Sequence, residues 1–477
     1  MLRINKRIVK YLLVLSCVVF VFSCGKDDPA PDDVQTDDDI MTDDDQVIVP
    51  PTGPLAELDF VKTYGGSGED DATGLLQTSD GNFVILGSTR STDGDLVGRT
   101  GEDADFWLLK VSPTGEKIWS KTYGGSEDDK ASKINKTSDG GFIVAGYSRS
   151  SDGDVSGNNG FHDYWIIKLD AEGNLQWNKN FGFLGSDQAF EAFQTTDGGY
   201  FVTGFFDVSA SGGDGNDATG NNGNNDSSRA GQHGVGEFWG IKLDATGTKE
   251  WRRYFGGSNN DRSYGALQTS DGGFLMIGQS ESTDFDIIDD KGSYDMWAVR
   301  LTADGTKLWT KSFGGSEIDL GYALTKTPDG NYLMVGDSRS SDKDVTSPIG
   351  NADVWAVKFN DAGNMLWQHS YGGTQFDSAR SVVPLNSGGF LLAGSTRSND
   401  VDVTTNKGQN DAWAIIIDAG GMLVSQNTVG GDQLDFGNEA MQASDGKIYM
   451  VGNTETNSDG DIPVNRGIKD FLFIKFK

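Results

Sequence analysis

The chain has 477 residues, of which 36% are hydrophobic and 66 are glycine. It carries 39 lysine and arginine residues against 71 aspartate and glutamate residues, a net charge of −32. A protein this acidic repels nucleic acid and anionic lipid headgroups, so we expect neither as a direct partner. The glycine content favours many short strands joined by tight turns.

Residues 1–23 have the pattern of an export signal, in which basic residues precede a short apolar stretch. That stretch is too short to cross a membrane as a helix. Val21-Phe22-Ser23-Cys24 resembles a lipobox, which implies that Cys24 is lipidated and anchors the chain in the outer membrane. The alternative is an ordinary signal peptide with an incidental cysteine. Gly25-Lys26-Asp27-Asp28 resembles the surface-export tag of Bacteroidetes-type lipoproteins, which implies exposure at the cell surface.

Residues 24–53 are predicted to form the lipidated cysteine and an acidic disordered tether. Residues 25–53 contain ten aspartates and few apolar residues, so they cannot bury enough surface to order themselves. The other cysteine, Cys17, lies within the expected signal. The exported protein would then have no thiol for a disulfide, a thiolate nucleophile or a cysteine metal site.

A repeated unit fills residues 54–477. Its landmark is an aromatic residue followed by glycine, spaced by 58 or 59 residues except between Phe181 and Phe255, where the spacing is 74. The copies begin at Tyr64, Tyr123, Phe181, Phe255, Phe313, Tyr371 and, with valine in the aromatic position, Val429. Seven copies of this length predict a repeat fold of seven blades.

Four strand-like segments recur in each unit, joined by Asp-Gly and Glu-Gly-Asn turns. All eleven tryptophans fall on the third or fourth segment, which predicts a core between blades. The last unit ends after its third segment, and residues 58–62 align with a fourth segment, with Phe60 in the tryptophan position. The predicted fold is therefore all-β, a seven-bladed β-propeller closed by an N-terminal outer strand.

The unit resembles the propeller repeats of bacterial surface and secreted proteins, with their Asp-Gly-Gly turn, Trp-x-x-Lys strand and Gly-Gly-Ser junction. This resemblance implies an extracellular setting and no single activity. Residues 169–177 also resemble the docking motif of quinoprotein-type propellers. Those enzymes have eight blades and a vicinal disulfide, which this chain lacks, so non-catalytic outer-membrane scaffold propellers are the closer analogy.

Aspartates recur in the junctions between units and in the loops between the second and third strands. In every unit except the third, this loop carries Asp-x-Asp and a further aspartate before the third strand. The metal candidates are Asp93, Asp95, Asp105, Asp152, Asp154, Asp163, Asp284, Asp286, Asp295, Asp342, Asp344 and Asp353. They either shape turns by accepting backbone N–H bonds or hold Ca²⁺, the one cofactor that the sequence suggests.

Unit three departs from the pattern. Its loop is enlarged to about 207–237, and Phe183-Leu184 replaces the glycine and serine of most other junctions. Within this loop, residues 212–217 resemble half of a Gly-Gly-x-Gly-x-Asp calcium-binding repeat. Such a departure marks a ligand-binding region, unless it is a neutral insertion. The candidate ligand-binding residues are Phe183, Leu184, Asp214, Asp217, His233, Arg252 and Arg253.

Catalytic motifs are missing from the sequence: the three histidines have no metal-ligand spacing, and the glycines punctuate hairpins. The sequence therefore predicts a non-enzymatic surface lipoprotein that acts as a binding or scaffold propeller, in nutrient uptake or adhesion. Its partner would be a glycan, a peptide or an outer-membrane protein. The alternative is a glycosidase-type propeller, because paired carboxylates are abundant.

Overall fold

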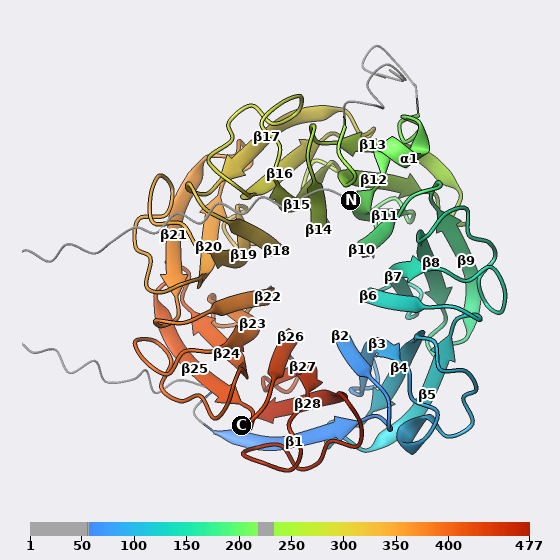
Figure 1. Ribbon diagram of the computed structural model, residues 1–477, viewed down its shortest axis with the longest axis vertical. Helices are drawn as coiled ribbons and strands as arrows, with labels where there is room; N and C mark the ends of the chain where they lie inside the picture. The colour runs from blue at the N-terminus through green and yellow to red at the C-terminus, as the bar shows by residue number, and fades with distance from the viewer. Residues whose placement is uncertain (1–54, 56, 218–232) are drawn as a thin grey trace, which may run out of the picture. The chain divides into compact units, whose positions relative to one another are not determined.

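The computed structural model describes residues 55, 57–217 and 233–477. The expected export signal, Cys24 and the acidic tether lie outside these residues. The described chain is all-β and forms seven four-stranded antiparallel sheets, arranged as blades around a central axis (Figure 1). This confirms the predicted seven-bladed propeller. A short helix, α1 (Val208–Ser211), and a 3₁₀ turn at Gly94–Leu96 interrupt the loops.

The first strand of each blade lies next to the axis, and the next two lie progressively outward (Figure 1). The innermost strands are β2 (Asp70–Gln77), β6 (Asp129–Lys136), β10 (Gln188–Gln194), β14 (Asp261–Gln268), β18 (Asp319–Lys326), β22 (Asp377–Pro384) and β26 (Asp435–Gln442). The second strands are β3 (Phe83–Thr89), β7 (Phe142–Ser148), β11 (Tyr200–Phe206), β15 (Phe274–Ser280), β19 (Tyr332–Ser338), β23 (Phe390–Thr396) and β27 (Ile448–Thr454). The third strands are β4 (Asp105–Val111), β8 (Asp163–Leu169), β12 (Glu237–Leu243), β16 (Asp295–Leu301), β20 (Asp353–Phe359), β24 (Asp411–Ile417) and β28 (Asp470–Phe476).

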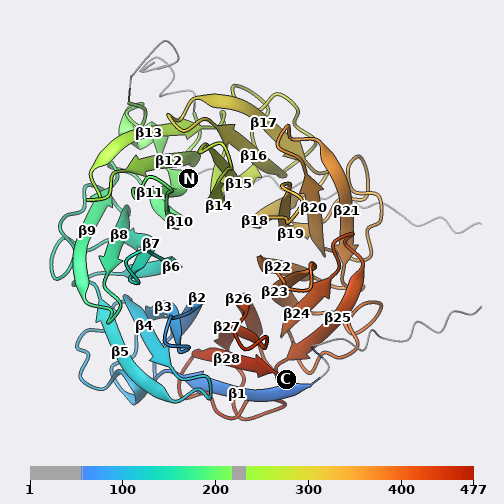
Figure 2. The ribbon, with the colours of Figure 1, turned by 180° about the vertical axis from the view of Figure 1, so that it is seen from behind.

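The outermost strand of blade seven comes from the other end of the chain. The other six blades end in β5 (Lys117–Tyr123), β9 (Leu175–Phe181), β13 (Lys249–Phe255), β17 (Lys307–Phe313), β21 (Met365–Tyr371) and β25 (Leu423–Val429). In blade seven, β1 (Leu58–Tyr64) pairs antiparallel with β28 outside the third strand (Figure 2). Phe60 faces Lys475 as Trp119 faces Lys110 in blade one, so the predicted N-terminal closure is confirmed.

The apolar core lies between neighbouring blades. One cluster joins Leu86 and Leu108 of blade one to Val144 and Trp165 of blade two. The six third-strand tryptophans are fully buried, as predicted for a core position; they are Trp107, Trp165, Trp239, Trp297, Trp355 and Trp413. Large rings fill the wedge that opens between twisted sheets, so they hold adjacent blades at a fixed angle.

The fourth-strand tryptophans have a different environment. Most are only half-buried, and each covers the glycine of the hairpin turn between the third and fourth strands of the next blade. A methyl group on Gly247 would come within 3.1 Å of Trp177, and one on Gly305 within 2.8 Å of Trp251. Both glycines have positive φ, so the turn requires glycine for its backbone and for this close approach.

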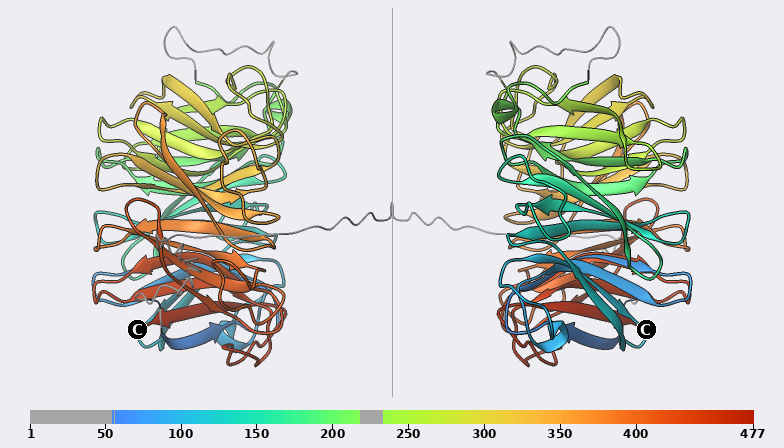
Figure 3. Two further views of the ribbon diagram at one scale, coloured as in Figure 1. Left: turned by 90° about the vertical axis from the view of Figure 1, so that its left-hand side faces the viewer. Right: turned by 90° about the vertical axis from the view of Figure 1, so that its right-hand side faces the viewer.

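Loops project from two opposite faces of the ring (Figure 3). The blade junctions and the loops between second and third strands share one face, as the sequence predicts, because they bond directly: Asp95 N donates to Gly65 O at 3.0 Å, and Asp154 N to Gly124 O at 2.9 Å. We call this side the junction face. None of the helices within 57–217 and 233–477 is long and apolar enough to cross a membrane.

Candidate functional site: junction carboxylates, blade three and the central channel

A buried aspartate begins or directly precedes the innermost strand of every blade and bonds the junction behind it. Its Oδ2 accepts the N–H of the residue four positions earlier, over 2.7–2.9 Å in all seven copies. The seven aspartates are Asp70, Asp129, Asp187, Asp261, Asp319, Asp377 and Asp435. Blade three keeps the bond although Phe183 replaces the second glycine, because the donor is a backbone group.

The aspartates of the loops between second and third strands bond the same junctions. Asp93 accepts the N–H of Ser67 at 2.6 Å, and the equivalent bonds of Asp152, Asp284 and Asp342 measure 2.7–2.8 Å. The second aspartate of each loop accepts the first junction glycine's N–H; these aspartates are Asp95, Asp154, Asp286 and Asp344, at 3.1–3.3 Å. Asp95 and Asp286 also pair with Lys117 and Lys307.

The third aspartate of each loop shapes the loop itself. The side chains of Asp163, Asp295 and Asp353 each accept the N–H of the residue four positions earlier, at 2.6–2.8 Å. The Asp105 carboxylate instead accepts a hydrogen bond from Arg99 Nε at 2.8 Å. These bonds support the turn interpretation of the aspartate pattern. Within 57–217 and 233–477, no group of three or more His, Cys, Asp or Glu residues is arranged to hold a metal ion. Calcium binding stays a prediction.

The first junction glycine lies between two buried carboxylates from successive blades. A methyl group on Gly314 would come within 2.5 Å of Asp295 Oδ1 and 2.6 Å of Asp319 Oδ2. Burial, reinforced by neighbouring acids, raises the pKa of Asp295 to about 8 and that of Asp187 to about 7. The pKa values of Asp105, Asp163 and the equivalent residues Asp353, Asp411 and Asp470 rise to about 6, chiefly through burial. These carboxyls therefore titrate near neutral pH.

Blade three brings together four of the seven candidate ligand-binding residues. The Asp217 carboxylate forms ion pairs with Lys249 at 2.8 Å and with Arg252 Nε at 3.2 Å. Its backbone oxygen accepts a hydrogen bond from the Arg253 guanidinium. The Arg252 guanidinium lies 5.0 Å above the ring of Phe183. The two arginines thus fasten the enlarged loop to the outer strand β13, and Asp217 already has cationic partners.

The other three candidates lie apart from this cluster. Leu184 is 76% exposed, and Asp214 is also exposed. His233 is buried; its ring stacks on Phe285 with centroids 4.8 Å apart, and its Nδ1 is 3.3 Å from Glu237. The structure therefore does not gather the predicted set into one pocket.

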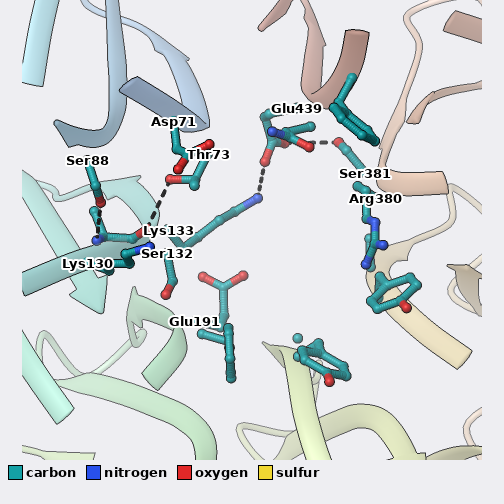
Figure 4. Close-up of a pocket in the computed structure, with 18 of the residues that line it drawn as sticks. Asp71, Thr73, Ser88, Lys130, Ser132, Lys133, Glu191, Arg380, Ser381 and Glu439 are labelled. Atoms are coloured by element: carbon teal, nitrogen blue, oxygen red, sulfur yellow. Dashed lines mark hydrogen bonds and ion pairs between the residues drawn. The ribbon is translucent and has the colours of Figure 1, made fainter. Parts of the chain in front are cut away.

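A cavity of about 570 Å³ occupies the central channel, lined by all seven innermost strands (Figure 4). Its volume falls in the range of small-molecule binding sites. Sequence analysis did not single out this site. Each innermost strand has a register shift near its third or fourth residue, and the extra residue lines the cavity. These seven channel residues are Thr73, Ser132, Phe190, Tyr264, Tyr322, Arg380 and Asn438.

The channel residues vary around the ring, and only blades four and five share a residue type, tyrosine, whereas the junction aspartates recur in all seven blades. A β-bulge leaves its extra residue outside the ladder of paired residues, so strand pairing places little constraint on its identity. The signal was available in the sequence: the residue three positions after each junction aspartate varies in size, charge and polarity. Without a known bulge, the strands' alternation does not show that this residue faces the axis.

Charged side chains also meet in the channel. Lys133 forms an ion pair with Glu439, and Ser381 Oγ donates to the same carboxylate at 3.0 Å (Figure 4). Glu191 points toward Lys133, and burial raises its pKa to about 7. Asp71 and Lys469 pair at 2.9 Å. The cavity thus combines aromatic rings, hydroxyls, amides and both signs of charge, which is the composition of a specific binding site.

No protein-family model matches the chain, and neither does any curated protein. The chain resembles the solved WD40 β-propeller domain of Doa1, with 12% identity, a TM-score of 0.45 and coverage of 87% of this chain and 97% of that one. A protein of unknown function from Bacteroides caccae has 10% identity and a TM-score of 0.33, with coverage of 77% of this chain and 93% of that one. A catalytically inactive virginiamycin B lyase from Staphylococcus aureus has 8% identity and a TM-score of 0.46, with coverage of 87% of this chain and 99% of that one. These likenesses concern the fold alone.

The raised pKa values of the junction carboxyls predict that stability falls as pH rises. The folded state keeps protons that the unfolded chain loses near pH 4, so these groups' stabilisation is complete below that pH and is lost as pH rises through 6 to 8. The melting temperature should fall between pH 5 and pH 8. Asp295→Asn, which stays neutral, should melt about 2 °C above the native protein at pH 8 and level with it below pH 4.

The control for this measurement is Asp214→Asn, which removes the same charge from an exposed side chain. It should leave the pH profile unchanged. Equal effects of the two substitutions at pH 8 would attribute the slope to net charge rather than to buried carboxyls.

The calcium and turn interpretations predict opposite results in a chelation experiment. If the loop aspartates hold Ca²⁺, a chelator lowers the melting temperature at pH 7.5 and added Ca²⁺ restores it. If they only shape turns, the melting curve is indifferent to both additions. Differential scanning calorimetry with EDTA, then with excess Ca²⁺ or Mg²⁺, separates the two.

The Asp217 ion pairs predict a local structural role for that residue. Asp217→Ala leaves Lys249 and Arg252 without their shared carboxylate, so it should lower the free energy of unfolding by about 1 kcal/mol. Asp214→Ala, three residues earlier and exposed, should change it by less than about 0.5 kcal/mol. Thermal or urea denaturation measures both, and equal effects would contradict the assignment.

Proposed function

We propose that this protein is a cell-surface lipoprotein that binds its ligand, without catalysis, in the central channel of the propeller. The lipid on Cys24 would anchor it in the outer membrane, and the acidic tether would hold the propeller away from the bilayer. Its partner would be a glycan, a peptide or an outer-membrane protein, as part of nutrient uptake or adhesion. The lipobox and the surface-export tag support the location.

The observation that carries the binding function is the pattern of variation among the seven blades. Junction aspartates, junction glycines and core tryptophans recur around the ring because each blade must pack against its neighbour in the same way. The seven channel residues comprise six different amino acids, with tyrosine only in blades four and five, and they share one cavity. Side chains that differ where the fold permits any residue are best explained by contact with an asymmetric molecule.

Blade three is the weaker candidate for ligand contact. Its arginines are engaged by Asp217, and its aromatic residue Phe183 lies under Arg252. These contacts account for the unusual residues as fasteners of the enlarged loop.

One observation favours the alternative of a glycosidase. Two channel carboxyls, Glu191 and Glu439, differ in environment: burial holds the pKa of Glu191 near 7, whereas Glu439 pairs with Lys133. Glycosidases use a protonated and an ionised carboxyl in this way. Against this, the carboxylate of Glu439 is already occupied by Lys133 and Ser381.

A screen of glycans and peptides with product analysis tests the proposal. The native protein should retain a ligand and release no product. Tyr264→Ala should weaken retention by at least about tenfold, since a channel ring supplies contact area, while Phe161→Ala, an exposed ring outside the channel, should not. Product release that Glu191→Gln abolishes would establish the glycosidase instead. Retention unaffected by Tyr264→Ala would place the ligand elsewhere.

A further inference from the structure

The seven channel residues form two arcs on the wall of the cavity, one aromatic and one of hydroxyl and amide side chains, with a single cationic side chain between them. Blades three, four and five contribute Phe190, Tyr264 and Tyr322; blades seven, one and two contribute Asn438, Thr73 and Ser132; and blade six, between the arcs, contributes Arg380. A ligand seated there meets rings on one side and hydroxyl or amide groups on the other.

The aromatic arc is continuous across the three blades. Ring centroids of Phe190 and Tyr264 lie 5.1 Å apart, and those of Tyr264 and Tyr322 lie 5.3 Å apart. All three side chains are half-buried, so part of each ring faces the cavity. Such rings accept the apolar C–H face of a sugar ring as readily as another aromatic group.

Arg380 extends this arc and presents charge at its end. Its guanidinium carbon lies 3.7 Å from the centre of the Tyr322 ring. A guanidinium is planar, and one of its N–H edges matches a carboxylate through two parallel hydrogen bonds. Among the described residues, no carboxylate lies within 4.0 Å of Arg380 to use it.

The charge balance of the cavity is the reverse of the chain's. The lining carries four cations, Lys130, Lys133, Arg380 and Lys469, against three acids, Asp71, Glu191 and Glu439. The whole chain has 39 cations against 71 acids. Lys133 and Lys469 are paired within the lining, which leaves two cations, Arg380 and Lys130, against one acid, Glu191. An excess of cations at a cavity in an acidic protein favours an anionic ligand.

We propose that the channel binds a carboxylate-bearing saccharide, such as a uronic acid unit, with its ring against the aromatic arc and its carboxylate on Arg380. The hydroxyl and amide side chains of Asn438, Thr73 and Ser132 would face the sugar hydroxyls. This inference rests on the proposed binding function and adds the class of ligand. A sugar acid is the ligand that uses all three parts of the wall at once: an apolar face, many hydroxyls and one planar anion.

Calorimetric titration of the purified protein with trigalacturonic acid and with its methyl ester tests this. The two probes have the same rings and hydroxyls, and only the acid carries charge. The acid should bind at least tenfold more tightly than the ester. Arg380→Gln should remove that difference, because it abolishes the charge partner and keeps a side chain of similar length. Higher salt should weaken the binding of the acid and leave the binding of the ester unchanged.

Arg397→Gln is the matched control. Arg397 lies on the same blade and also stacks over a ring, with its guanidinium carbon 5.9 Å from the centre of Phe376, but it does not line the cavity. The Arg397→Gln variant should bind both probes as the native protein does. A melting curve of each variant establishes that it is folded.

Other outcomes overturn the inference in distinguishable ways. Equal binding of acid and ester, or a preference that survives Arg380→Gln, would refute the assigned ligand class. If Tyr264→Ala still abolished retention of a neutral glycan or a peptide, the channel would remain the binding site. Absence of binding to either probe, together with retention of another ligand that Tyr264→Ala leaves intact, would refute both proposals.

Discussion

At six of the seven blade junctions two acidic side chains converge on the first glycine, and the geometry of the ring depends on their accommodation there. One belongs to the third strand of the preceding blade and the other lies at the start of the next blade, as Asp295 and Asp319 do around Gly314. Any side chain on such a glycine would collide with both. Because the second carboxylate also accepts a junction N–H, it positions each innermost strand relative to the blade before it.

This arrangement separates the frame of the protein from the channel that we propose as its recognition surface. The frame is the repeated set of junction bonds, buried tryptophans and hairpin turns, and a change in any of them disturbs packing between blades. The channel is lined from bulges, where the inserted residue has no partner across the sheet. The frame can therefore stay constant while the channel changes. The two requirements that usually compete in a binding protein, stability and specificity, fall here on different residues.

Most of the frame was predictable from the sequence, because repetition itself carries the information. The spacing of the Gly-Gly junctions gave the number of blades, and the alignment of Phe60 with the fourth-strand tryptophans gave the closing strand, which pairs as expected. The aspartate pattern also indicated a turn role, since such carboxylates accept nearby backbone N–H groups. Repetition did not distinguish the two tryptophan sets, of which only the third-strand rings are all fully buried.

The candidate site was harder to predict, for the same physical reason. The sequence directed attention to blade three, where the insertion breaks the repeat; there Asp217 forms ion pairs with Lys249 and Arg252, and a ligand-binding role stays a prediction. The residues that share the cavity, such as Phe190 and Arg380, are far apart in sequence, and a bulge decides their orientation. Alternation along a strand would place them wrongly, and only the assembled ring shows that they face one another.

The bulges also determine what kind of molecule the ring can distinguish. Seven identical units would enclose a cavity with seven-fold symmetry, which suits a spherical ion on the axis but offers a chiral molecule seven equivalent orientations. Varying the side chain among the bulges removes that degeneracy without altering a single strand pairing. Successive duplication of one unit, followed by divergence at a single position per copy, would thus convert a symmetric pore into a receptor with one preferred pose. The order of Thr73, Ser132, Phe190, Tyr264, Tyr322, Arg380 and Asn438 around the axis would define the pose of the proposed ligand.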